Sequence, residues 1–167
     1  MALTISVRLA TVEDAPMVAA AARIAGSAWE TQSAINNILD DQAHIYLAIA
    51  NWPERSLVNR PVAMCHWRQS SRTVDHLAID PALVPDTQAN RAARLRLVDR
   101  VLAAVVQRAI NRGATTGSAE WIKTGTPISA YIESITGVTK TMMDAARARY
   151  SMDLAAALAF LQARTPA

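Results

Sequence analysis

The stretch from Arg72 to Gly113 constrains the fold of this 167-residue chain more than any other. It begins with a short apolar run, residues 73–79, that has the length of one strand. Asp80 and Pro81 end this strand, and a polar turn follows. Beyond the turn, apolar residues recur at steps of three and four, which predicts one long helix. The predicted apolar stripe consists of Leu95, Val98, Leu102, Val105 and Ala109.

The two ends of this helix carry recognisable signals. Asp86 or Thr87 is the predicted N-cap, and Gly113 stands where a helix C-terminal glycine is usual. The first turn of the helix points back toward the end of the strand. Unpaired backbone N–H groups and the positive end of the helix dipole meet there, so we expect an anion-binding site.

The same stretch resembles the strand-turn-helix segment of the GCN5-related N-acetyltransferases, the GNAT superfamily. In that family the segment holds the pyrophosphate of acetyl-CoA with glutamine or arginine, a glycine three residues later, and glycine or alanine two residues after that. The matching residues here are Gln88, Arg91 and Ala93, so arginine replaces the central glycine. That glycine normally lets the backbone approach a phosphate closely. The cofactor-binding residues that the resemblance implies are Leu77, Ala78, Ile79, Gln88, Ala89, Asn90, Arg91, Ala92, Ala93 and Thr126.

The rest of the chain follows the same family order over about residues 5–153. Strands are predicted at 4–10, 44–50, 61–67 and 114–121, an exposed connection at 51–60, a hairpin at 138–144 and 147–153, and helices at 17–24, 31–41, 126–135 and 154–164. The resemblance implies an α/β (α+β) fold of the GNAT-like acyl-CoA N-acyltransferase type. Its sheet is mixed and mainly antiparallel, with helices on both faces and a cofactor cleft between the strands 73–79 and 114–121. We expect one domain, 1–167, whose last helix packs on the domain or at a homodimer interface.

Composition narrows the other possibilities. Cys65 is the only cysteine, which excludes an intrachain disulfide and a cysteine-based zinc cluster. The histidines lack metal-ligand spacing, so we expect no metal. No apolar run resembles a signal peptide or reaches the roughly 20 residues of a membrane span, and we expect a cytoplasmic protein. The net charge of +3 suits an anionic ligand such as CoA or an acidic protein surface, while the aromatic content of 5% does not favour nucleic acid.

Acetyl transfer to an amine needs a base for the ammonium proton and a donor that polarises the thioester carbonyl. The resemblance implies that a backbone N–H of residues 77–79 is this donor. Glu120, at the end of the fifth predicted strand, is the first candidate base. Asp75 and His76 are alternatives, and strand alternation predicts that only one of them faces the cleft.

Two further roles come from the resemblance. In many GNAT enzymes a tyrosine four residues before a Gly-Phe pair protonates the CoA sulfur. Gly137 and Val138 stand for that pair, so Glu133 holds the tyrosine position. Tyr131, two residues earlier and about 200° away around a helix, is the candidate acid, and only a local shift would bring it into the family role. The first two helices and their loop form one wall of the acceptor pocket in the family, which implies substrate contacts for Trp29, Glu30 and Asp75.

Two functions remain open from the sequence. The first is acetyl-CoA-dependent acetyl transfer to a primary amine by direct attack in a ternary complex. The second is a GNAT-fold binding protein with weak or absent catalysis, which docks on another protein through Arg91, Arg94, Arg96 and Arg100. Cations near a helix N-terminus are disfavoured by about 0.3–1 kcal/mol each, a cost that phosphate groups or an acidic partner would offset.

Overall fold

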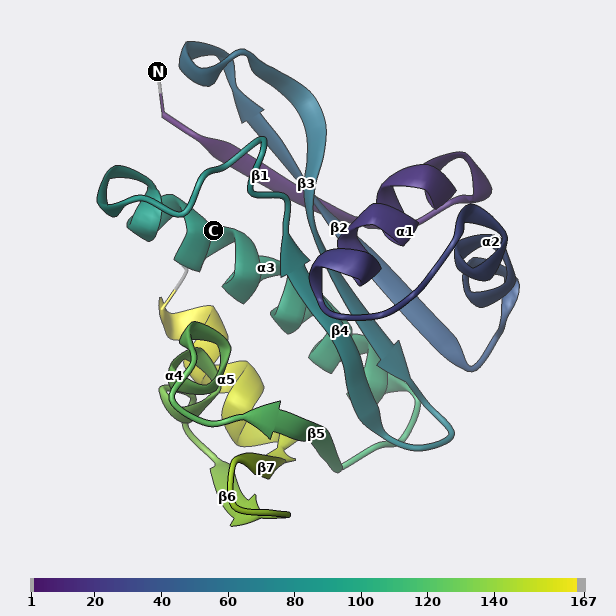
Figure 1. Ribbon diagram of the computed structural model, residues 1–167, viewed down its shortest axis with the longest axis vertical. Coiled ribbons are helices and arrows are strands. Elements are labelled where there is room, and N and C mark those ends of the chain that lie inside the picture. Colours follow the sequence, from purple (N-terminus) through teal and green to yellow (C-terminus); the bar gives the residue numbers. More distant parts are fainter. Residues whose placement is uncertain (1, 165–167) are drawn as a thin grey trace.

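A single seven-stranded sheet forms the centre of the molecule, in the order β1-β2-β3-β4-β5-β7-β6. The structure is a computed structural model that describes residues 2–164 (Figure 1). The strands are β1 (Thr4–Leu9), β2 (Ala43–Trp52), β3 (Leu57–Arg68), β4 (Thr73–Ile79), β5 (Thr116–Lys123), β6 (Val138–Met142) and β7 (Arg147–Asp153). Neighbouring strands run antiparallel except β4 and β5, which are parallel.

Helices cover both faces of this sheet (Figure 1). One face packs against α1 (Ala15–Ile24) and α2 (Thr31–Leu39), and the other against α3 (Arg91–Asn111) and α5 (Leu154–Arg164). The short helix α4 (Pro127–Glu133) follows β5, and 3-10 turns occupy Val12–Asp14, Pro53–Arg55 and Gln88–Asn90. The predicted mixed, mainly antiparallel sheet with helices on both faces is therefore confirmed.

The alternation of side chains along β2 explains how one strand serves two cores. Ile45, Leu47 and Ile49 pack with α1, while Ala48 and Ala50 face α3. Successive residues of a strand point to opposite faces, so an uninterrupted apolar run fits a strand that is covered on both sides.

The long helix differs from its predicted form at its start and along its buried face. It begins at Arg91, after the 3-10 turn that Thr87 precedes, and ends before Gly113, which has the left-handed φ of 93°. Leu95, predicted in the apolar stripe, is 37% exposed, whereas Leu97 and Val101 are fully buried. Both the sheet and α5 cover α3, so its buried face is wider than one stripe.

Two predicted boundaries were wrong. The exposed connection at 51–60 shrinks to Pro53–Ser56, because Trp52 still pairs with Leu57 and Leu57 is buried in the core. The fifth strand starts at Thr116 rather than at residue 114. The amide of Ala114 donates to the carbonyl of Ala109, 3.0 Å away, and so still belongs to the helix end.

Candidate active site

The two parallel strands at the middle of the sheet separate almost as soon as they meet. Within the described residues, β4 and β5 share the single register pair Thr73–Ser118, beside the bond from the Ser118 amide to the Arg72 carbonyl at 2.9 Å. Beyond it β5 continues beside β7 and diverges from β4 (Figure 1). Consequently the β5-facing N–H and C=O groups of β4 after Thr73 have no strand partner among these residues. The predicted splay of the strands is confirmed.

A cleft of about 360 Å³ lies at this divergence. Its walls come from β4, β5, α4 and the loop after α1, with Leu77, Ala119 and Ile132 among the apolar side chains. Asp75 and His76 supply the ionisable groups on the β4 wall. A mostly apolar slot with a few convergent polar groups is the usual form of a small-molecule site.

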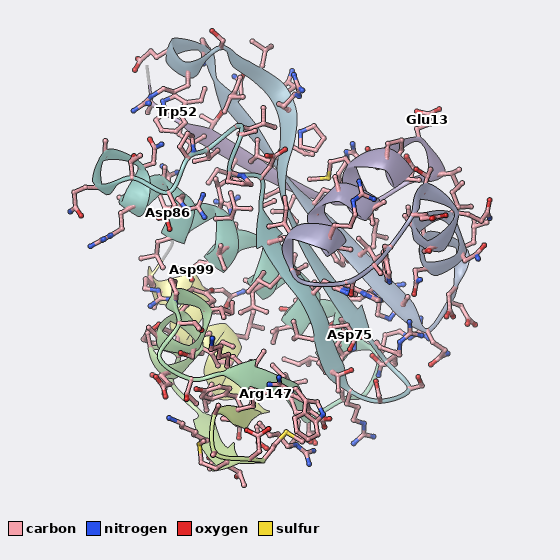
Figure 2. The ribbon with its side chains drawn as sticks, viewed as in Figure 1. Glu13, Trp52, Asp75, Asp86, Asp99 and Arg147 are labelled. Atoms are coloured by element: carbon pink, nitrogen blue, oxygen red, sulfur yellow. The ribbon has the colours of Figure 1, made fainter. Side chains whose placement is uncertain are left out.

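A bulge in β4 explains why Asp75 and His76 both line this cleft. His76 pairs with His66 on β3, but the next pair is Val74 with Trp67, so Asp75 is the extra residue. The expectation that only one of the two faces the cleft was therefore wrong, since a bulge interrupts strand alternation. The Asp75 carboxylate accepts from Arg68 Nε at 3.3 Å and from Thr73 Oγ1 at 2.6 Å. Figure 2 labels Asp75 at the lower part of β4.

His76 is the centre of a hydrogen-bonded chain of three side chains. Its Nδ1 lies 2.9 Å from Nδ1 of His66, and its Nε2 lies 2.5 Å from Oγ of Ser27, in the loop between α1 and α2. The two imidazole rings are nearly parallel, with an interplanar angle of 6°. Trp29 packs against both imidazoles, with its ring centroid 4.7 Å from that of His76 and 5.4 Å from that of His66.

Burial decides the protonation state of both histidines. His66 is 0% exposed and His76 8%, and this burial lowers the pKa of each ring below its usual value. Asp75 acts in the opposite direction, by raising the pKa of both. The rings are therefore neutral near pH 7, and His76 has the form that a general base needs.

The sequence did not single out Ser27 or His66. The sequence places His66 and His76 on two adjacent predicted strands, so a contact between them was possible. Which residues pair depends on the register of the two strands, and that register brings His66 opposite His76. Ser27 is 49 residues away from His76 in the chain and reaches it through the α1–α2 loop.

The predicted acceptor wall divides into residues near the cleft and residues outside it. Trp29 packs on the histidine pair, and its carbonyl accepts from Arg23 Nη1 at 2.6 Å. Glu30 is the exposed N-cap residue of α2, and its amide donates to Ser33 Oγ at 3.3 Å. Among the described residues of α1, α2 and the loop between them, Ile24 at the end of α1 and the next two residues, Ala25 and Gly26, line the cleft.

Glu120 occupies a different position from the one expected of a base. It lies in a β5 irregularity between Ala119 and Ile122, where Trp121 takes a φ of 58°. Its carboxylate is 3.5 Å from Arg149 Nε on β7. Of the described residues in this part of β5, Ala119 and Ile122 line the cleft and Glu120 does not.

Tyr131 is held in a buried ionic network away from the cleft lining. Its hydroxyl donates to Asp99 Oδ1 at 2.7 Å, and Arg164 donates to both oxygens of the same carboxylate, at 2.7 and 2.8 Å. Burial and Asp99 raise the pKa of Tyr131. In Figure 2, Asp99 lies where α3, α4 and α5 meet. Glu133, in the family's tyrosine position, instead binds Lys140 at 3.1 Å and accepts from the Tyr150 hydroxyl at 3.2 Å.

The predicted cofactor segment spans the end of β4 and the start of α3. Leu77 lines the cleft, whereas Ala78 and Ile79 are buried on opposite faces of the sheet. Asn90 is buried, and its Nδ2 donates to the Pro85 carbonyl at 2.9 Å. The remaining residues of the segment lie at the surface or partly buried in the first turns: Gln88, Ala89, Arg91, Ala92 and Ala93.

Thr126 has a local structural contact. Its Oγ1 caps α4 by accepting from the Ser129 amide at 3.3 Å, and donates to the Lys123 carbonyl at 2.7 Å.

Three of the four clustered arginines are bonded to their own chain. Arg94 donates to the Val84 carbonyl and lies 3.7 Å from Asp86, which ties the turn before α3 to the helix. Arg96 and Arg100 donate to carbonyls of the N-terminal segment, those of Leu3 at 3.4 Å and Ile5 at 3.1 Å. Arg91 is exposed and forms no hydrogen bond or ion pair with any residue that the structure describes.

Two kinds of feature are absent from residues 2–164. No three His, Cys, Asp or Glu side chains are grouped so that they could hold a metal ion there. No helix in this range is long and apolar enough to cross a membrane.

Comparison with known proteins identifies the fold. No family model matches the sequence, and no curated protein matches it. Solved structures do resemble the chain, among them the PaiA N-acetyltransferase of Thermoplasma acidophilum in complex with coenzyme A, at a TM-score of 0.63 and 10% identity over 90% of this chain and 99% of that one.

Two further solved structures show the same likeness. A putative acetyltransferase, YncA, of Salmonella typhimurium with its cofactor acetyl-CoA has a TM-score of 0.64 and 14% identity, over 90% of this chain and 94% of that one. The ribosomal-protein-S18-alanine N-acetyltransferase of Escherichia coli has a TM-score of 0.59 and 14% identity, over 89% and 92%. At these identities the likeness establishes the fold, and the predicted GNAT-like fold is confirmed.

Proposed function

We propose that this chain, a divergent protein of the GNAT fold, transfers an acetyl group from acetyl-CoA to a primary amine. The observation that carries the proposal is the cleft between β4 and β5 with a neutral, hydrogen-bonded histidine on its wall. Structures of the same fold have been solved with coenzyme A and with acetyl-CoA. Fold alone does not define an activity, so the cleft and its side chains must supply the argument.

The cofactor would occupy the gap between the strands. Amide groups of its pantetheine arm would pair with the open β5-facing edge of β4, whose backbone groups otherwise lack a strand partner within the described residues. The pyrophosphate would lie at the first turn of α3, where N–H groups and the helix dipole favour an anion. Arg91, exposed in that turn, takes the place of the family's glycine and would add a cationic contact.

Residues of the cleft wall, together with Ser27 as the hydrogen-bond partner of His76, support a direct transfer. Ser27 would accept a proton from the substrate ammonium as its own hydroxyl proton moves to His76 Nε2, 2.5 Å away. The neutral amine then attacks the thioester carbon, whose oxygen would be stabilised by a backbone N–H of β4 near Leu77. When the C–S bond breaks, the electron pair stays on sulfur and coenzyme A leaves as the thiolate, while the attacking nitrogen loses its second proton to solvent to give the neutral amide. Asp75, which raises the pKa of His76, would stabilise the transient imidazolium.

In this mechanism no side chain of α4 protonates the coenzyme A sulfur. Of the described residues on this helix, Ile128 and Ile132 line the cleft, and the Tyr131 hydroxyl is bound to Asp99. The thiolate would therefore take its proton from solvent.

The first experiment is cofactor binding by thermal shift and calorimetry with acetyl-CoA and coenzyme A. Ligand at about 100 times the dissociation constant should stabilise the fold by about 2.7 kcal/mol. The second is release of free thiol from acetyl-CoA in the presence of a panel of primary amines. Absence of binding at millimolar acetyl-CoA would eliminate the enzyme hypothesis.

The alternative function, a binding protein that docks through the arginines of α3, stays a prediction, and fewer of these arginines are free to take part in it. Arg94, Arg96 and Arg100 each bond to their own chain, which gives these arginines a structural reason to be present. Charge reversal of exposed Arg91, followed by a pull-down at low and high salt, tests the docking surface directly.

A further inference from the structure

A second depression, of about 200 Å³, lies away from the cleft and shares no lining residue with it. It is formed by the end of β1, the start of β2, the segment just after α2 and the C-terminal end of α3. Apolar side chains, including Leu9, Ile38 and Ile45, make up much of its wall. Its charged and polar lining consists of Asp41, His44, Arg108 and Arg112.

Two of these polar side chains contain buried atoms without a partner. His44 is 4% exposed, and its Nε2 accepts or donates no hydrogen bond within the described residues. Arg108 Nε is likewise buried and unpaired there. Native proteins satisfy the large majority of buried polar atoms, so two unpaired atoms in the wall of one depression indicate a place where a polar group can bind.

The charges around the depression are also unbalanced. Neither the Arg108 nor the Arg112 guanidinium forms an ion pair with any residue from 2 to 164. Arginine near a helix C-terminus is favoured by the helix dipole, which accounts for the presence of these charges. The helix dipole does not explain why Arg108 Nε is buried without an acceptor. The dipole acts through the carbonyl groups of the last turn, which do not pair with this nitrogen.

We propose that this depression binds a small organic carboxylate with an apolar body. Two guanidinium groups one helical turn apart offer the forked donors that match a carboxylate, and His44 adds a third donor or acceptor. The apolar wall would hold the body of the ligand. Asp41 reduces the net positive charge of the lining, which favours a monoanion over a doubly charged phosphate ester. Carboxylate binding at this site does not require acetyl-CoA, so this inference and the proposed acetyl transfer can be tested independently.

The His44 ring provides a local readout. Burial lowers its pKa, Arg108 and Arg112 lower it further, and Asp40 raises it. A carboxylate bound between the arginines would offset their charge, so the pKa of His44 should rise as the site fills. The imidazole resonances can be followed by NMR while benzoate is added, and benzyl alcohol serves as the uncharged probe of similar shape.

Benzoate should shift the His44 resonances saturably, whereas benzyl alcohol and sodium chloride at equal ionic strength should not. The double variant Arg108→Gln/Arg112→Gln should weaken benzoate binding about 10-fold or more, because each charged hydrogen bond is lost. The exposed Arg147→Gln, which removes the same charge from β7, is the matched control and should keep the wild-type affinity. A response to inorganic phosphate but not to benzoate would overturn the ligand class. No saturable response to either anion would mean that water alone fills the depression. Equal affinity in the double variant would overturn the assignment of the two arginines as the carboxylate donors.

Discussion

His66 and His76 share one hydrogen bond between like atoms, Nδ1 to Nδ1 at 2.9 Å. Only one of the two nitrogens can hold the proton when both rings are neutral. If His76 Nδ1 carries it, His76 Nε2 is free to accept the Ser27 hydroxyl proton, which is the tautomer that a base requires. If His66 carries it, His76 Nε2–H donates to Ser27 instead. The tautomer of His66 and the ability of His76 to act as a base are therefore linked.

The first prediction concerns His76 as the base. His76→Gln should lower kcat by about 10²–10⁴, the usual contribution of a general base, with little change in acetyl-CoA affinity. The comparison variant is Glu120→Gln, whose carboxylate pairs with Arg149 outside the cleft lining. Steady-state kinetics with a competent amine measures both variants. Loss of activity in Glu120→Gln with His76→Gln unaffected would transfer the role of base to Glu120.

The second prediction concerns His66 as a positioning residue. His66→Ala removes the partner of His76 Nδ1, so kcat should fall and the acidic limb of the pH–rate profile should move. His66→Gln retains a hydrogen-bonding group and should recover part of the rate. A loss of activity with an unchanged pH profile in both variants would assign His66 a packing role only.

The third prediction is a pH dependence of stability. Burial is the largest cause that lowers the pKa of His44, His66 and His76, while the unfolded value is about 6.5. Below about pH 6.5 the unfolded chain therefore binds more protons than the folded one, and the free energy of unfolding should fall as pH decreases from about 7 to 5.

Denaturant titrations across this range measure the effect. The variant His66→Gln/His76→Gln should flatten the slope, which for each histidine is at most about 1.4 kcal/mol per pH unit. The lowered carboxyl pKa of Asp14, which pairs with Arg8, gives the same sign but acts only at more acidic pH. An unchanged slope in the double variant would contradict the assignment of neutral, buried rings.

The fourth prediction separates a phosphate contact from ordinary surface charge. Arg91→Ala should weaken coenzyme A binding, because this exposed guanidinium lies in the first turn of α3, where an anion is favoured. Arg112→Ala, at the opposite end of the same helix, is the control and should leave coenzyme A binding unchanged. Calorimetry at two salt concentrations measures coenzyme A binding by both variants. Equal effects would show that Arg91 makes no specific contact with the phosphate groups.

The local patterns of the sequence predicted much of the fold. The strand 73–79 matches β4 at both ends, and Gly113 follows α3 as expected. These features depend on residues close together in the chain, where apolar periodicity and glycine conformation are informative. Leu95 was misplaced because the packing of α5 on α3 is a long-range contact.

The candidate site depends on relationships that no local pattern contains. The bulge at Asp75 and the pairing of His66 with His76 follow from strand register, which is set by the whole sheet. Ser27 reaches His76 through a loop whose path depends on the packing of α1. The family resemblance predicted the cleft correctly, but the network that holds Tyr131 required the positions of Asp99 and Arg164.

The last prediction concerns Tyr131, the candidate acid for the coenzyme A sulfur. Its hydroxyl donates to Asp99, a carboxylate that is 0% exposed and also binds Arg164. Tyr131→Phe should therefore lower the free energy of unfolding by about 1–3 kcal/mol, since a hydrogen bond to a buried charged group is lost. Arg164 still neutralises Asp99, which keeps the loss below that of an unpaired buried charge. The rate of acetyl transfer below the melting temperature should stay within about twofold of wild type. A kcat that falls by 10-fold or more in a variant that keeps its stability would restore Tyr131 to the role that the family resemblance implies.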